Sequence, residues 1–212
     1  MNLSILVGSC DEYSFLWNKF IYLFNKYWDH DLNLDKYILT QNLHVNSDQF
    51  KTIATGKIPW TQRLKLALDN IKSDYILWLQ DDYFFIRKIP SSTIQDYLNF
   101  ITQYNIDRFG IHENSNLYIF ANTAHKYVKY SQLSLYTISL QASIWNKQFL
   151  LSCIDNDETP WQFEIDGSNR LNYRQHNIYL DVQNPPWYLE AMKQGKHTID
   201  YYNICKQEGL DP

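Results

Sequence analysis

The sequence predicts an α/β fold: a single domain with a twisted, mostly parallel central sheet, helices on both sides and a smaller antiparallel part. Two observations predict it. Short apolar runs alternate with amphipathic helical stretches over residues 1–110, which is the pattern of a sheet wrapped by helices. The chain has 212 residues, of which 45% are hydrophobic and 17% aromatic, so we expect one domain with a sizeable core rather than disorder.

The first half of the chain contains three predicted strands and two predicted helices. Apolar runs at 3–7, 36–40 and 74–79 predict the strands, and the last run is apolar on both faces, as expected of a buried central strand. A polar connection follows the second strand. The helices are indicated by apolar residues at helical spacing: Leu16, Phe20, Leu23 and Tyr27 in the first, and Leu64, Ala67, Leu68 and Ile71 in the second.

Capping patterns predict two later helices. Ser92 followed by Gln95 resembles a capping box, and apolar residues continue that helix to Ile101. Thr159 as N-cap, with Pro160 at the first helical position and Gln162 at the third, predicts another. Residues 107–145 contain the strand-like pieces "RFGIH", "NLYIF" and "LYTISL", which predict an antiparallel or mixed extension of the sheet. The last 40 residues are aromatic and polar with weak periodicity.

Charge and cysteine usage exclude several classes of function. The formal net charge is -4 and no Lys/Arg cluster occurs, so nucleic-acid binding is disfavoured. Cys10, Cys153 and Cys205 are odd in number and far apart, which favours a reducing, cytoplasmic setting over a disulfide framework. No signal sequence or membrane-spanning stretch is expected, so any membrane association would be peripheral, at the inner face of the membrane.

Two adjacent acids, Asp81 and Asp82, directly follow the predicted buried strand. Ligands of open α/β sheets bind beyond the carboxyl ends of the strands, and two carboxylates there need a cation or hydrogen-bond donors. Mg²⁺ or Mn²⁺ suits oxygen ligands that also hold a diphosphate. The structural alternative is that the pair caps the following turn.

Most of the chain resembles glycosyltransferases of the GT-A type. The segment "WTQRLKLALDNIKSDYILWLQDDYFF" resembles the helix and strand that precede their metal motif, with Gln80 where an acid often stands. The segments "VGSCDEYSFLWNKFIYLFNKYW", "SLQASIWNKQFLLSCI" and "ETPWQFEIDGS" are similar to family-2-like enzymes of bacterial and viral capsule, lipopolysaccharide and surface-glycan synthesis. The resemblance implies a single Rossmann-like GT-A domain over residues 1–212.

The resemblance also assigns a donor pocket and a metal site. It implies that Asp82 binds Mn²⁺ or Mg²⁺ and that Asp81 faces the ribose or the sugar. Gly8, Ser9 and Asp11, in the loop after the first strand, would approach the nucleotide, although Asp11 is equally well explained as a helix N-cap. Trp60 and Arg63 lie on one helix face, where the guanidinium suits a pyrophosphate, the alternative being a solvated helix charge.

Catalytic candidates lie in the second half. In inverting GT-A enzymes a carboxylate at the position of Glu164 deprotonates the acceptor, and Asp166 is the second candidate. The alternative for Glu164 is an ordinary acid near a helix N-terminus. His197, near the C-terminal end of the sequence, is a candidate further metal ligand, because some GT-A enzymes use a C-terminal histidine. The alternative is that it is a surface residue, as a lone histidine more often is.

The expected function is metal-dependent transfer of a sugar from a UDP- or dTDP-linked donor to a glycan or glycolipid acceptor in surface polysaccharide synthesis. The resemblance favours inversion at the anomeric carbon, and retention stays open because no sequence feature fixes the stereochemistry. Residues 1–110 would bind the nucleotide sugar and residues 111–212 the acceptor. Two alternatives stay open: a non-catalytic sugar- or nucleotide-sugar-binding module, and a sugar nucleotidyltransferase on a related fold. Nothing in the sequence indicates an oligomeric state.

Overall fold

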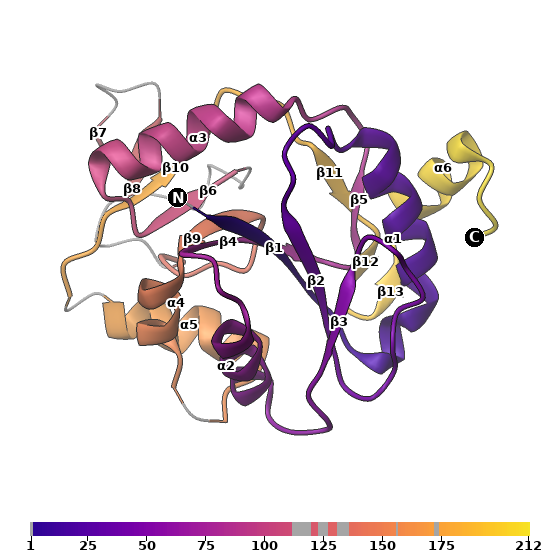
Figure 1. The fold of residues 1–212 in the computed structure, drawn as a ribbon, viewed down its shortest axis with the longest axis horizontal. Coiled ribbons are helices and arrows are strands. Elements are labelled where there is room, and N and C mark those ends of the chain that lie inside the picture. The colour runs from indigo at the N-terminus through magenta and orange to yellow at the C-terminus, as the bar shows by residue number, and fades with distance from the viewer. Residues whose placement is uncertain (1, 112–119, 123–126, 131–135, 156, 172–173) are drawn as a thin grey trace.

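A nine-stranded sheet forms the centre of the protein within the residues that the computed structural model describes, which are 2–111, 120–122, 127–130, 136–155, 157–171 and 174–212 (Figure 1). The strand order is β3-β2-β1-β4-β9-β6-β10-β8-β7. The bounds are β1 (Leu3–Gly8), β2 (Asp35–Thr40), β3 (Lys51–Ala54), β4 (Tyr75–Gln80), β6 (Arg108–Gly110), β7 (Phe120–Asn122), β8 (Val128–Tyr130), β9 (Ser143–Asn146) and β10 (Ile178–Leu180).

The sheet is mostly parallel, which confirms the predicted fold class. Strand β1 pairs in parallel with β2 and with β4, and β2 pairs in parallel with β3. Strand β6 pairs in parallel with β10. Strand β9 runs antiparallel between β4 and β6, and β8 runs antiparallel to β10. Two small antiparallel sheets lie beside it, one joining β5 (Tyr83–Phe85) to β11 (Tyr188–Glu190) and one joining β12 (Met192–Lys193) to β13 (Lys196–His197).

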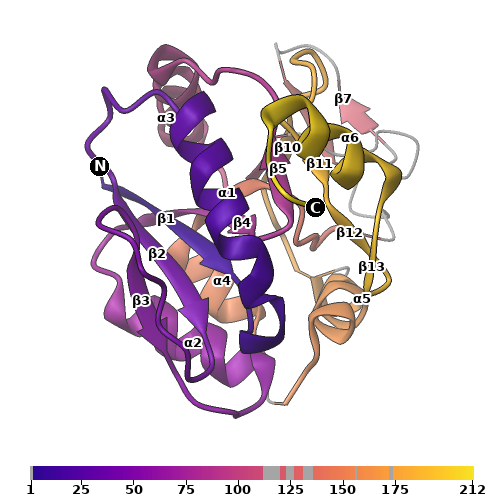
Figure 2. The same ribbon diagram turned by 90° about the vertical axis from the view of Figure 1, so that its right-hand side faces the viewer.

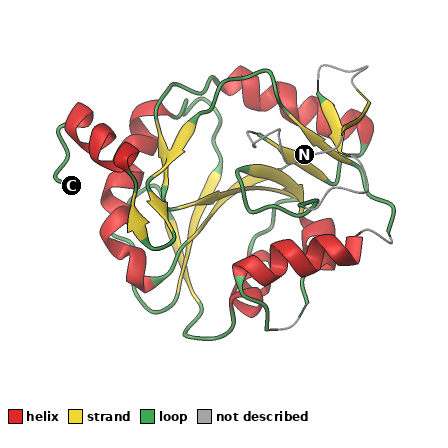
Figure 3. Ribbon diagram, turned by 180° about the vertical axis from the view of Figure 1, so that it is seen from behind, coloured by secondary structure: helices red, strands yellow, loops and turns green. Residues whose placement is uncertain are grey.

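Helices cover both faces of the sheet because its strands are apolar on both faces. Along β1, Ile5 and Val7 join the core under α1, whereas Leu6 joins the core under α2. One face carries α1 (Ser14–Tyr27) and α3 (Ser91–Tyr104), and α6 (Ile199–Glu208) packs against the small sheet of β5 and β11 (Figure 2). The other carries α2 (Trp60–Asn70), α4 (Lys147–Cys153) and α5 (Pro160–Leu171), as the view from behind also shows (Figure 3).

Two capping predictions have opposite outcomes. At α5, Gln162 N–H donates to Thr159 Oγ1 over 3.3 Å and Thr159 N–H donates to Gln162 Oε1 over 2.9 Å, which confirms the capping box. At α3 the prediction is wrong. That helix begins one residue earlier, after Pro90, without a side-chain cap, and the Gln95 amide bonds Asn99 instead. Proline's fixed φ already sets the entry to this helix.

Several elements differ from the sequence expectation. Residues 136–140 of "LYTISL" form no strand, and the strand follows at β9 instead. Most of "NLYIF" lies outside the described residues, and β7 begins at its last residue, Phe120. The edge strand β3 and the helix α6 are additional. The three cysteines are free. No helix in the described ranges is both long and apolar enough to cross a membrane.

Candidate functional site

A pocket of about 390 Å³ opens beyond the carboxyl ends of β1 and β4. These strands are parallel neighbours with Gly8 opposite Gln80, so both end at the same edge of the sheet. The pocket is lined by the loop after β1, the start of α2, the end of β4, the start of α5 and the β12–β13 turn: Gly8, Ser9, Cys10, Tyr13, Trp60, Arg63, Trp78, Gln80, Asp81, Asp82, Leu140, Pro160, Trp161, Glu164, Met192, Gln194 and Gly195.

Asp81 is held at the floor of the pocket by the loop after β1. Ser9 Oγ donates to Asp81 Oδ2 in a short hydrogen bond, and Trp17 Nε1 donates to Ser9 Oγ over 2.7 Å. Burial raises the pKa of the Asp81 carboxyl to about 7, and the neighbouring Asp82 adds to the rise. The side chain therefore takes up a proton near neutrality unless a cation or further donors enter the pocket.

Asp82 has the properties expected of a cation ligand. Its Oδ1 is buried and has no hydrogen-bond partner among the described residues. Burial, followed by the negative charge of Glu190, raises the pKa of its carboxyl to about 7. No group of three or more metal-ligating side chains occurs in the described part of the chain. Mg²⁺ and Mn²⁺ sites built from one or two carboxylates, substrate phosphates and water need no such group, so these residues fit the predicted ion.

Arg63 is buried and holds the loop after β1 in place. Its Nη2 donates to the Ser9 carbonyl over 2.7 Å, and its Nε donates to Thr55 Oγ1 over 3.2 Å. The guanidinium is therefore not the solvated helix charge of the alternative interpretation. Trp60, on the same helix, packs edge-on against Trp78 at 6.1 Å between ring centroids.

Gly8, the last residue of β1, allows the backbone to lie close to the Trp78 ring. A Cβ at position 8 would lie 2.5 Å from two atoms of the indole ring, which is shorter than real contacts. This close approach explains the glycine, because any side chain there would displace the indole that forms the pocket wall.

Asp11 is not among the residues that line the pocket. Its carboxylate accepts the backbone N–H groups of Gln41, Asn42 and Leu43 over 3.0–3.1 Å, so it ties the loop after β1 to the loop after β2. These hydrogen bonds lower the pKa of the carboxyl against the opposing effect of desolvation. The N-cap alternative is wrong, because Asp11 is the first residue of a 3₁₀ turn (Asp11–Tyr13) whose N-cap is Cys10.

Glu164 reaches the pocket from the first turns of α5. Its Oε1 accepts the Leu140 backbone N–H over 2.6 Å. The Leu140 carbonyl in turn accepts from Trp78 Nε1, Gln80 Nε2 and Tyr83 Oη over 3.1–3.3 Å. Asp166, two residues along the helix, is exposed and does not line the pocket.

His197 is the last residue of β13 and is not part of the pocket lining. Its ring stacks on Tyr201 at 4.0 Å between centroids and meets the edge of Phe15 at 5.6 Å. Its Nε2 is buried and has no hydrogen-bond partner among the described residues. Opposite it in the hairpin stands Met192, which does line the pocket.

Several pocket residues escape sequence reasoning. Tyr13, Trp78, Leu140 and Met192 look like ordinary core positions. Gly195 is the one usable sequence signal, because two-residue hairpin turns favour a glycine. In the structure Gln194 and Gly195 form such a turn, with positive φ angles of 51° and 75°.

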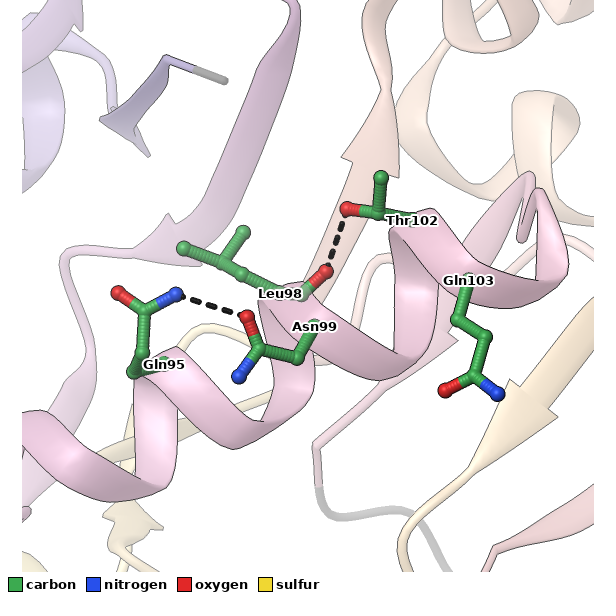
Figure 4. Close-up of a pocket in the computed structure, with 5 residues that line it drawn as sticks. All are labelled: Gln95, Leu98, Asn99, Thr102 and Gln103. Carbon is green, nitrogen blue, oxygen red and sulfur yellow. Dashed lines mark hydrogen bonds between the residues drawn. The ribbon is translucent and has the colours of Figure 1, made fainter.

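A second hollow, about 500 Å³ in volume, lies along α3 and has different chemistry (Figure 4). Its lining consists of five residues of that helix, none of them charged. Gln95 Nε2 donates to Asn99 Oδ1, and Thr102 Oγ1 donates to the Leu98 carbonyl, so polar groups are already engaged within the helix. The pocket at β1 and β4 is the better candidate because acids, an arginine and aromatic rings converge there.

Comparisons with known proteins establish the fold. No model of a known protein family matches the chain, and no curated protein matches it in sequence. The S. aureus TarS structure covering residues 1–349 is similar at a TM-score of 0.60 with 13% identity, over 98% of this chain and 64% of that one. The same TarS fragment with UDP-GlcNAc matches at 0.56 and 14%, over 98% and 65%.

A second group of structures has the same arrangement. CMP:2-keto-3-deoxy-manno-octonic acid synthetase with CTP matches at a TM-score of 0.57 with 12% identity, over 99% of this chain and 100% of that one. The chain spans somewhat less than two thirds of the TarS fragment. It has a GT-A-like fold, which holds UDP-GlcNAc in one similar protein and CTP in another.

Proposed function

We propose that the protein transfers a sugar from a UDP- or dTDP-linked donor to a glycan or glycolipid acceptor, in the synthesis of a surface polysaccharide. The observation that carries the proposal is the convergence of Asp81, Asp82 and Glu164 on one pocket at the carboxyl ends of β1 and β4. The fold supports it, because TarS has been solved with UDP and with UDP-GlcNAc.

The donor is expected between the loop after β1 and Asp82. Gly8 ends β1 and Ser9 begins that loop, Arg63 fixes the Ser9 carbonyl, and Trp60 supplies an aromatic wall. A Mg²⁺ or Mn²⁺ ion bound by Asp82 would neutralise the charge that builds up on the leaving diphosphate. The buried, unpartnered Oδ1 of Asp82 is the atom that supports this role.

The acceptor is expected on the side of α5. Glu164 takes the proton of the acceptor hydroxyl while its oxygen forms a bond to the anomeric carbon, and the bond from that carbon to the diphosphate breaks, its electron pair leaving with the nucleoside diphosphate. Attack from the face opposite the leaving group inverts the anomeric centre. Trp161, one turn earlier on the same helix, lines the pocket with 71% of its surface exposed and offers a flat apolar face to a sugar ring.

A nucleotidyltransferase is the second candidate, supported by the full-length match to the CTP-bound synthetase. Such an enzyme must hold a triphosphate. Arg63 is the only basic residue among the described lining residues, and its guanidinium is engaged with Ser9 and Thr55. The site therefore favours a donor that carries two phosphates.

A thermal-shift screen with UDP-GlcNAc, UDP-glucose, UDP-galactose and dTDP-rhamnose, each with Mn²⁺ or with EDTA, tests the donor. A nucleotide sugar that binds the folded state raises the melting temperature. We expect a shift with Mn²⁺ that EDTA abolishes. Stabilisation by CTP or UTP, together with release of pyrophosphate from that triphosphate when a sugar phosphate is added, would instead establish the nucleotidyltransferase.

The Glu164→Gln variant tests the base. The rate of UDP release, as the sugar of the selected UDP-sugar is transferred to the acceptor or to water, should fall at least about a hundredfold, since a positioned base contributes ~10²–10⁴-fold. Donor binding should be unchanged. Asp166→Asn is the matched control, because this acid lies outside the pocket and should lose little. A folded Glu164→Gln protein with normal turnover would refute the role of Glu164.

A further inference from the structure

The backbone of Leu140 connects the end of β4 to Glu164. Its carbonyl accepts from three side chains: Trp78 Nε1 over 3.1 Å, Gln80 Nε2 over 3.3 Å and Tyr83 Oη over 3.1 Å. Its N–H donates to Glu164 Oε1 over 2.6 Å. Leu140 is itself buried and lines the pocket, so the segment that carries it forms part of the wall beside Glu164.

Position 80 requires a hydrogen-bond donor in this arrangement. A carbonyl oxygen only accepts, so the side chain that faces Leu140 must present N–H or O–H. The Gln80 amide also donates to Tyr83 Oη over 3.1 Å, which leaves the hydroxyl proton of Tyr83 for the Leu140 carbonyl. A carboxylate would supply no donor to either atom. The contacts thus explain a glutamine directly before Asp81 and Asp82.

We infer that Gln80 is a positioning residue for Glu164. Gln80 and Tyr83 together fix the Leu140 backbone, and the Leu140 N–H holds one oxygen of the Glu164 carboxylate. The effect on turnover rests on the proposed function of Glu164, whereas the chain of contacts can be tested without any substrate.

The substitution Gln80→Glu separates this role from a metal-ligating one. The introduced carboxylate attracts the Tyr83 hydroxyl proton, so the Leu140 carbonyl loses two of its three donors. Gln80→Met, of similar size, removes only the two hydrogen bonds that Gln80 itself donates, so the Leu140 carbonyl loses one of its three donors. If position 80 belonged to the cation site, an acid would improve it. If Gln80 positions Glu164, the acid is the more harmful of the two changes.

Amide hydrogen exchange at Leu140, followed by NMR, measures the contact directly. We expect exchange to become about three- to tenfold faster in Gln80→Glu, in keeping with the loss of about one hydrogen bond, and to change less in Gln80→Met. Gln141→Met is the matched control. It removes the side-chain hydrogen bonds that Gln141 makes with Glu190 and Tyr188, and it leaves the hydrogen bonds of the Leu140 backbone to Trp78, Gln80, Tyr83 and Glu164 in place. Unchanged exchange at Leu140 in Gln80→Glu would overturn the inference.

Turnover measurements test whether Gln80 affects catalysis through Glu164. UDP release from the UDP-sugar selected by thermal shift should show a kcat about ten- to a hundredfold lower in Gln80→Glu, with UDP affinity by calorimetry unchanged. In the Glu164→Gln background the same substitution should cause no further loss, because both changes act through one carboxylate. Equal losses in both backgrounds would overturn the inference. If Glu164 is not the base, the Glu164→Gln variant by itself will show normal turnover, so that failure is distinguished from a failure of the inference about Gln80.

Discussion

Replacing Asp82 with asparagine is expected to stabilise the metal-free protein at pH 8 and to stabilise it by less than half as much at pH 5. Burial raises the pKa of this carboxyl from its ordinary value of 3.8 to about 7. Between these two values the folded protein holds a proton that the unfolded chain releases. The contribution of Asp82 to the free energy of unfolding therefore decreases as the pH rises from about 4 to 7, and the penalty is complete above pH 7.

The magnitude follows from the size of the pKa shift. One pKa unit corresponds to about 1.4 kcal/mol, so three units correspond to about 4 kcal/mol at most. Solvent reaches the open side of the pocket and weakens the penalty, so we expect a gain of about 1–3 kcal/mol for Asp82→Asn at pH 8. With Mn²⁺ and UDP present, the wild type should be more stable than Asp82→Asn, because the ion binds only the ionised carboxylate and stabilises only the native protein.

Urea unfolding at pH 5, 6, 7 and 8, followed by tryptophan fluorescence, measures this difference. The difference between Asp82→Asn and wild type should grow with pH and level off above pH 7. Asp69→Asn, an exposed acid on α2, is the matched control and should show the same pH dependence as wild type. A constant difference between Asp82→Asn and wild type across this range would refute the assignment of a protonated, buried Asp82.

Three further predictions concern the pocket wall. Gly8→Ala should lower the free energy of unfolding by about 1–3 kcal/mol in urea melts, because its Cβ would meet the Trp78 indole at 2.5 Å. Arg63→Met should weaken UDP binding in calorimetry by several-fold, since the Ser9 carbonyl loses its 2.7 Å donor and the loop after β1 loosens; unchanged affinity would contradict this role. Trp161→Ala should raise the KM for the acceptor while UDP affinity stays constant, whereas Trp161→Phe should retain much of the acceptor affinity. A loss of UDP affinity in Trp161→Ala would instead place the indole beside the nucleotide.

The sequence predicted the part of the fold in which hydrophobic pattern and burial coincide. Strands β1, β2 and β4 and helices α1 and α2 are marked by apolar residues that do enter the two cores. The pattern fails at α6, where Ile199 is 73% exposed and Tyr202 48% exposed while Cys205 is buried. It also fails at β3, an edge strand whose four residues are exposed or half-buried.

The candidate site was predictable where a side chain follows a recognisable element. Asp81, Asp82 and Glu164 were found because they follow a buried strand or a capped helix start, and the structure brings them to one pocket. The partners of Asp11 were not predictable, since the N–H groups of residues 41–43 become neighbours only through the parallel pairing of β1 and β2. The same holds for Leu140, which contributes backbone atoms and no chemistry of its own.

The pocket joins segments from opposite ends of the sequence, and this affects how the site forms during folding. The wall at Gly8 to Cys10 belongs to the end of the first strand and the loop after it, while Met192, Gln194 and Gly195 belong to a hairpin that ends close to the last helix. Contacts of such high sequence separation form late, after the loop-closure entropy has been overcome. A chain emerging from the ribosome completes β1 and β4 long before this hairpin is synthesised. Nucleotide binding is therefore expected to report completion of folding, and partly folded forms that already contain the sheet should bind no donor.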